Sequence, residues 1–183
     1  MKNIIFFFIV LSPFILSAQK KDCKYEKNEI DEFEKILVKV TKEETVRKGI
    51  GYPVVRFALA KVGDNYAVIM FLSNGKPLCF TSDSELLLLK SNDEVIRLSF
   101  GQNGVECLNL VYVPGAGITQ YTNQLKFLVS ETDLISLQSD QIKKIRIVAS
   151  EEIIEVDLTK GNTTKEAGMT YFIRNVKCVL GGG

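Results

Sequence analysis

The chain has 183 residues, with 23 lysines and arginines against 22 aspartates and glutamates, and it contains no histidine. Without histidine it cannot supply the imidazole base of a Ser-His-Asp or Cys-His catalyst, nor the usual nitrogen ligands of zinc. The charges are balanced and form no long block of one sign, which disfavours binding to nucleic acid. We therefore predict no catalytic residue, no metal, no cofactor and no nucleic-acid partner.

The first residues have the three parts of a secretory signal: basic Lys2, an apolar run over 4–16, and the small residues Ser17 and Ala18. A run of about 13 residues is shorter than the roughly 20 that a membrane-spanning helix needs. We predict cleavage after Ala18, so that 1–18 is a signal peptide. The remainder, 19–183, is expected to be a single β-rich domain without a membrane span, in the periplasm or outside the cell.

Short β-rich runs separated by turn residues dominate the middle of the chain, a pattern typical of an antiparallel sheet. In the first clear hairpin, 54–62 pairs with 66–72 around an Asp64-Asn65 turn. Both faces of this hairpin are apolar, which predicts a position in the middle of the fold. Further strands are expected at 36–41, 105–113 and 124–129.

A second hairpin joins 86–90 to 95–100 around a two-residue Asn92-Asp93 turn. This register predicts a buried face made of Leu87, Leu89, Ile96, Leu98 and Phe100. The opposite face, which we expect to be only partly covered, comprises Leu86, Leu88, Lys90, Val95 and Arg97.

A third hairpin joins 142–149 to 153–158. An even-length loop sets Ile147 opposite Val156 on the core side and Arg146 opposite Asp157 outside, whereas an odd loop would set Ile147 against a glutamate. The even register is therefore predicted.

Ser130 followed by Asp133 has the spacing of a helix cap, which predicts a short helix near 131–138 with Leu134 and Leu137 pointing inward. A capping box of Thr163 and Glu166 similarly opens a longer helix near 164–180. Apolar residues at helical spacing form one stripe on it: Met169, Phe172, Ile173, Val176, Val179 and Leu180. These elements together predict an α+β fold, mostly antiparallel sheet, with the C-terminal helix packed on the sheet.

Four cysteines, Cys23, Cys79, Cys107 and Cys178, would enter an oxidising compartment. No two have the Cys-x-x-Cys spacing of a redox or zinc motif, so disulfides are the favoured interpretation. Cys178 lies opposite the centre of the apolar stripe and faces away from the sheet. We predict a bridge between Cys23 and Cys178, which leaves Cys79 and Cys107 as a second bridge or as two buried thiols.

Three patterns could in principle carry chemistry. The segment 113–118 contains Gly-x-Gly after a strand, but a strand follows it instead of the helix that would hold a pyrophosphate. Ser73 and Lys76 fit a Ser-x-x-Lys string, but Asn-Gly between them indicates a turn. The densest carboxylates, Asp31, Glu32, Glu34, Glu151 and Glu152, fall in predicted loops. The remaining candidate is a binding loop over 113–122, flanked by Tyr112 and Tyr121.

The leader ending Ser17-Ala18-Gln19 resembles those of exported Bacteroidetes proteins. The stretch 86–100, with its leucine-rich strand, polar turn and Val-Ile-Arg-Leu strand, is similar to a hairpin of small exported proteins of unknown function from that group. So is the stretch 127–147, where a strand, a short helix and an Ile-Lys-Lys-Ile-Arg-Ile strand follow one another. This resemblance implies export but no established activity, and it supplies no site residues.

We interpret the chain as an exported non-enzymatic accessory or binding module, whose partner is a protein or small ligand of the cell envelope. One alternative is a hydrolase that uses carboxylates or a Ser/Lys pair, and another is a structural subunit of a surface assembly. A concave pocket with converging acidic side chains would favour the enzyme, whereas an exposed apolar patch would favour a partner.

Overall fold

The computed structural model describes residues 23–48, 53–113, 118–160 and 165–181. The predicted signal peptide 1–18, the loop glycines Gly115 and Gly117, and the capping residue Thr163 lie outside the described residues.

Strands dominate the described part of the chain, as predicted. They are β1 Tyr25–Ile30, β2 Leu37–Thr41, β3 Glu44–Arg47, β4 Val54–Val62, β5 Asn65–Asn74, β6 Cys79–Phe80, β7 Glu85–Lys90, β8 Val95–Phe100, β9 Glu106–Cys107, β10 Asn109–Val113, β11 Ile118–Val129, β12 Ile142–Val148 and β13 Ile153–Asp157. The helices are α1 Glu131–Ser139, α2 Lys165–Met169 and α3 Tyr171–Leu180. The predicted α+β class is confirmed, with a C-terminal helix packed on an antiparallel sheet.

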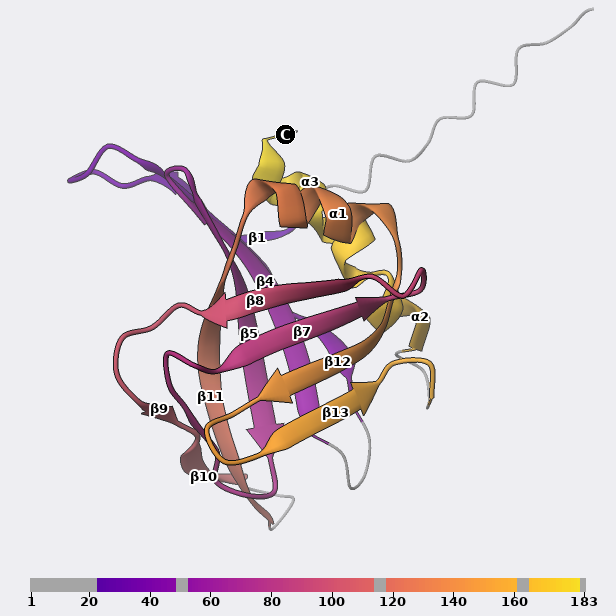
Figure 1. Ribbon diagram of the computed structural model, residues 1–183. Helices are drawn as coiled ribbons and strands as arrows, with labels where there is room; N and C mark the ends of the chain where they lie inside the picture. The colour runs from indigo at the N-terminus through magenta and orange to yellow at the C-terminus, as the bar shows by residue number, and fades with distance from the viewer. Residues whose placement is uncertain (1–22, 49–52, 114–117, 161–164, 182–183) are drawn as a thin grey trace, which may run out of the picture.

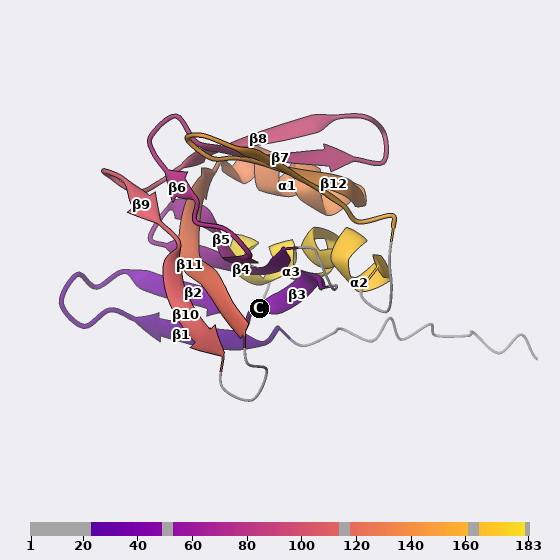
Figure 2. The same cartoon turned by 90° about the horizontal axis from the view of Figure 1, so that it is seen from below.

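One sheet runs in the order β1-β2-β4-β5-β11-β8-β7-β12-β13, and its neighbouring strands are antiparallel. Strands β11 and β8 pair only at Phe127 with Phe100 and at Leu128 with Ser99. The sheet bends at this short junction into a back half (β1, β2, β4, β5, β11) and a front half (β8, β7, β12, β13). Figures 1 and 2 show the two halves as layers whose strands cross.

The main core fills the space between the two halves and the helices. Phe57 of β4 contacts Tyr171 and Phe172 of α3, with ring centroids 5.7 and 5.5 Å apart. Phe100 contacts Phe127 edge to face across the junction, with ring centroids 5.8 Å apart. Helices α1 and α3 lie side by side at one end of this core (Figure 1). One continuous core therefore joins both halves of the sheet and the helices.

The first hairpin has the predicted faces but a different turn. Val62 pairs with Asn65, so the turn is Gly63-Asp64, one residue earlier than expected. Gly63 has a φ of 59°, in the left-handed region that favours glycine. Moving a two-residue turn by one position leaves the inward and outward sets unchanged. One face joins the main core, and the other forms a small cluster of Ala58, Ala60, Ala67 and Ile69.

The predicted face of β7 is wrong. Leu89 pairs with Val95 and Leu88 with Ile96, because the loop after Lys90 has three residues instead of two, with Asp93 at a φ of 70°. An odd loop moves every side chain of β7 to the other face. Leu86 and Leu88 therefore point into the main core, and Leu87 and Leu89 point outward.

The third hairpin keeps its predicted faces, but its register is displaced by two residues. Ile147 lies opposite Ile154 instead of Val156, and Arg146 lies opposite Glu155. The parity of the loop is even, as predicted, so Ile145, Ile147 and Val156 all remain in the core.

Helix α1 is close to its prediction, with Ser130 accepting from the Asp133 N–H and with Leu134 and Leu137 buried. The single helix predicted near 164–180 is instead divided at Thr170 into α2 and α3. At Thr170 the backbone leaves helical geometry, with φ −96° and ψ 6°. Just before it, the backbone of Gly168 meets strand β3, where an added Cβ would lie 2.3 Å from the Val46 carbonyl oxygen. The Thr170 hydroxyl also donates to the Glu166 carbonyl, at 2.7 Å.

Both disulfides tie distant segments together. The predicted bridge between Cys23 and Cys178 is confirmed, with their Cα atoms 5.6 Å apart. Cys178 is nevertheless buried, because the N-terminal segment covers it and the Tyr25 hydroxyl donates to its carbonyl at 3.0 Å. Cys79 and Cys107 form the second bridge, between the paired strands β6 and β9.

Candidate functional site

The loop between β1 and β2 carries an apolar side chain that the fold does not cover. Phe33 is 95% exposed, and Ile30, Leu37 and Val62 are also exposed beside it. We call the segment from Ile30 to Leu37, together with Val62 of the adjoining β4–β5 turn, the hairpin tip. Figures 1 and 2 show this hairpin projecting well beyond the body of the protein.

The hairpin tip is ordered by its own backbone. The Asp31 carboxylate accepts from the N–H groups of Phe33 and Glu34, both at 2.9 Å. These bonds, that from Glu34 first, hold the pKa of Asp31 below its ordinary value. The Asp31 carbonyl accepts from the N–H of Lys35, which has a φ of 57°, and the Asp31 N–H donates to the Ile36 carbonyl. Phe33 is thus presented to solvent on a turn that is already formed.

The charge of the hairpin tip is negative. Three carboxylates, those of Asp31, Glu32 and Glu34, surround Phe33, whereas Lys35 is the basic residue of the turn. A surface that binds this tip therefore needs an apolar recess with basic groups at its rim. Phe33 was not among the site residues predicted from the sequence. The feature that could have indicated it is a single aromatic residue within an otherwise charged run.

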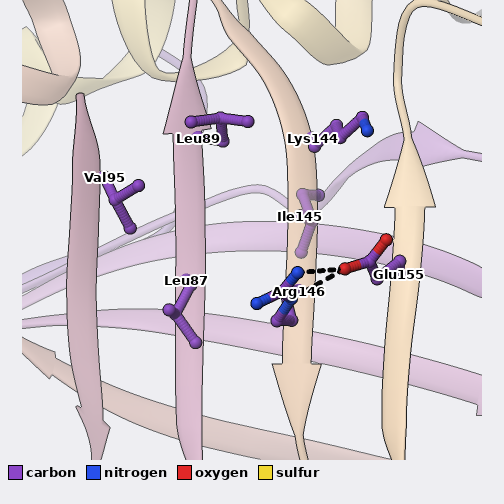
Figure 3. Close-up of a pocket in the computed structure, with 7 residues that line it drawn as sticks. All are labelled: Leu87, Leu89, Val95, Lys144, Ile145, Arg146 and Glu155. Carbon is purple, nitrogen blue, oxygen red and sulfur yellow. Dashed lines mark hydrogen bonds and ion pairs between the residues drawn. The ribbon is translucent and has the colours of Figure 1, made fainter. Parts of the chain in front are cut away.

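A recess of that kind lies on the outer face of the front half. Leu87 and Leu89 form its floor beside Val95, which is 45% exposed, and its volume is about 120 Å³. Lys144 and Arg146 of β12 stand along one side (Figure 3). Ile145 of β12 and Glu155 of β13 complete the lining, and we call these seven residues the front-face hollow. Leu87 and Leu89 lie on this outer face because the three-residue loop after Lys90 sets the register of β7.

The basic residues of the front-face hollow differ in their partners. The Arg146 Nε donates to Glu155 at 2.8 Å, and this pair is drawn in Figure 3. Lys144 makes no ion pair with any residue in the described ranges. Within the described residues, the hollow therefore has one positive charge that no acidic side chain pairs with.

The predicted binding loop is only partly described. Strands β10 and β11 pair Leu110 with Tyr121 and Tyr112 with Thr119, so both tyrosines lie on one face of this ribbon. Tyr112 is 62% exposed, whereas Tyr121 packs against the main core. Residues 114–117 between the strands lie outside the described residues. Binding by Tyr112 and Tyr121 together stays a prediction.

A buried lysine, Lys90, contacts two serines, and these contacts bear on the hydrolase alternative. The Lys90 Nζ donates to Glu94 at 2.7 Å, Ser136 at 3.0 Å and Ser139 at 3.1 Å. All three ammonium protons are therefore used, whereas a serine–lysine catalyst needs a neutral amine. The Ser136 hydroxyl donates to Glu94, whose pKa is lowered by Lys90 and then by Ser136. The arrangement ties α1 to the β7–β8 hairpin.

The other residues weighed for chemistry lie apart. The Ser73 hydroxyl donates to Thr122, whereas Lys76 pairs with Glu152, at 2.9 Å. In the part of the chain that the structure describes, no three carboxylate or cysteine side chains are grouped to hold a metal ion. Nor does any helix there have the length and apolar character to cross a bilayer.

Comparison of the chain with protein-family models, curated proteins and solved structures found no match. The resemblance to small exported Bacteroidetes proteins therefore stays a prediction.

Proposed function

We propose that this protein is an exported, non-enzymatic binding module that engages a protein partner through the hairpin tip. The observation that carries the proposal is the 95% exposure of Phe33 on an ordered, projecting turn. Burying an exposed phenylalanine side chain contributes about 1.5–3 kcal/mol. An aromatic side chain with this burial free energy, exposed to water at the end of a hairpin, is suited to anchor an interface.

The turn around Phe33 adds to this suitability. Its hydrogen bonds are made before any partner arrives, so little backbone entropy is lost on binding. The carboxylates beside Phe33 favour a partner with basic residues around an apolar recess. We infer recognition of a folded protein surface, because a single aromatic anchor on a projecting hairpin needs a recess to enter.

Export is part of the proposal. Its support is the leader-like segment 1–18 together with the bridges Cys23–Cys178 and Cys79–Cys107. Disulfides persist in oxidising compartments and are rare in the cytosol.

Affinity capture from the native cell envelope tests the proposal. We expect the Phe33→Ala protein to lose the partner that the unmodified protein retains. Ile135→Ala is the matched control, because Ile135 is 54% exposed on α1 and belongs to neither surface. Thermal unfolding of both variants verifies that they are folded. Equal recovery of every captured protein by the Phe33→Ala variant would refute the proposal.

A further inference from the structure

We infer that the hairpin tip of one copy binds the front-face hollow of a second copy, so that the protein associates head to tail. This inference rests on the proposed function, because it names the partner of the hairpin tip. It is carried by the complementarity of two surfaces on the same chain, neither of which is covered by the residues that the structure describes.

The hairpin tip and the front-face hollow are complementary in shape and polarity. Phe33 offers an aromatic ring at the end of a projecting turn, and the hollow offers Leu87, Leu89 and Val95 as an apolar floor. The tip belongs to the back half (Figure 1), whereas the hollow opens on the outer face of the front half (Figure 3). The two surfaces point in different directions, so their contact requires a second molecule.

The hairpin tip is acidic, and the rim of the front-face hollow carries basic side chains. Insertion of Phe33 brings Glu32 and Glu34 to the rim of the hollow, where Arg146 pairs with Glu155 and Lys144 makes no ion pair with any described residue. Opposite charges then meet around an apolar centre, as in specific interfaces. Contact between two hairpin tips would instead bring six carboxylates together around the two phenylalanines, and like charges disfavour it.

The contact between two copies joins two different surfaces. Each copy uses one surface to bind and offers a different surface to be bound, so the contact is heterologous and repeats from copy to copy. Because the contact is small, we expect weak association that rises with protein concentration and weakens with added salt.

Sedimentation velocity of the mature protein at increasing concentration, up to about 1 mM, tests the inference. We expect oligomers larger than dimers in the unmodified protein. Phe33→Ala in the tip and Lys144→Glu in the hollow should each lower the association constant by about tenfold or more. Ile135→Ala and Lys126→Glu are the matched controls, because both side chains are exposed outside the two surfaces. These controls should associate like the unmodified protein.

Mixing the two variants is the decisive measurement. The Phe33→Ala protein retains an intact hollow and the Lys144→Glu protein retains an intact tip, so an equimolar mixture should form a one-to-one complex and stop there. A mixture that stays monomeric would overturn the inference, as would an unmodified protein that is monomeric throughout. If that monomer still captures a different protein through Phe33, only the identity of the partner is wrong and the proposed function stands.

Discussion

The Nζ atom of Lys90 lies 2.7 Å from a carboxylate oxygen of Glu94, although the lysine side chain is only 2% exposed and the glutamate is 45% exposed. A buried ammonium is tolerated when its charge is paired and its protons are all bonded. Here Glu94 supplies the charge, and Ser136 and Ser139 on α1 complete the bonds. This cluster therefore holds α1 against the β7–β8 hairpin.

Glu94→Gln should destabilise the protein more than Lys90→Met does. The first change leaves a buried ammonium without its counter-charge, whereas the second replaces the ammonium with an apolar side chain of similar length. Urea unfolding of both variants measures the difference. Glu85→Gln is the control, because its ion pair with Arg97 on the same hairpin is exposed and contributes little. The opposite order for Glu94→Gln and Lys90→Met would show that the pair is not needed to bury the lysine.

The two disulfides should contribute unequally to stability. The Cys23–Cys178 bridge spans 155 residues and the Cys79–Cys107 bridge spans 28. The loss of chain entropy on closing such loops corresponds to about 5 and about 3.5 kcal/mol, respectively. Replacing both cysteines of a bridge with serine should therefore lower the free energy of unfolding more for the first pair. Chemical denaturation of the two double variants checks this order, and each variant is the control for the other.

Gly168→Ala should destabilise the packing of α2 on β3. A Cβ at this position would lie 2.3 Å from the Val46 carbonyl oxygen, which is backbone and cannot move aside cheaply. We expect a loss of about 1–3 kcal/mol in the free energy of unfolding. Gly75→Ala is the matched control, because nothing lies within 4 Å of its added Cβ. Equal unfolding midpoints for the two variants would contradict the close approach.

The buried face of a strand could be predicted from the sequence where apolar patterning determines it. It could not be predicted where the length of the next loop determines it. β4 and β5 are apolar on both faces, so any register of the right parity buries the same side chains. β7 contains four consecutive leucines, and such a run has no periodicity to show which side faces inward. Its register depends on whether the following loop has two or three residues, and the sequence fits both.

The surfaces proposed for binding were harder to predict for related reasons. Strand β1 was not predicted, because its sequence is largely polar and exposed and its pairing with β2 depends on tertiary structure. Without β1, the hairpin that presents Phe33 could not be predicted, and Phe33 was not selected as a site residue. The front-face hollow was missed because Leu87 and Leu89 were placed in the core. The Cys23–Cys178 bridge was predictable, since it follows from helical geometry and the oxidising compartment.

Leu88→Ala and Leu89→Ala form a matched pair that tests the register of β7 directly. Leu88 is completely buried in the main core, so its truncation should cost about 2–5 kcal/mol. Leu89 is only partly buried and faces the hollow, so its truncation should cost less than about 1 kcal/mol. Urea unfolding measures both values, and a two-residue loop after Lys90 would reverse their order.

The same pair separates stability from association. Because Leu89 belongs to the floor of the front-face hollow, Leu89→Ala should weaken concentration-dependent association while the protein stays folded. Leu88→Ala should lower the unfolding midpoint and leave the association of the folded protein unchanged. A Leu89→Ala variant that unfolds early and associates normally would place this leucine in the core and remove the floor of the hollow.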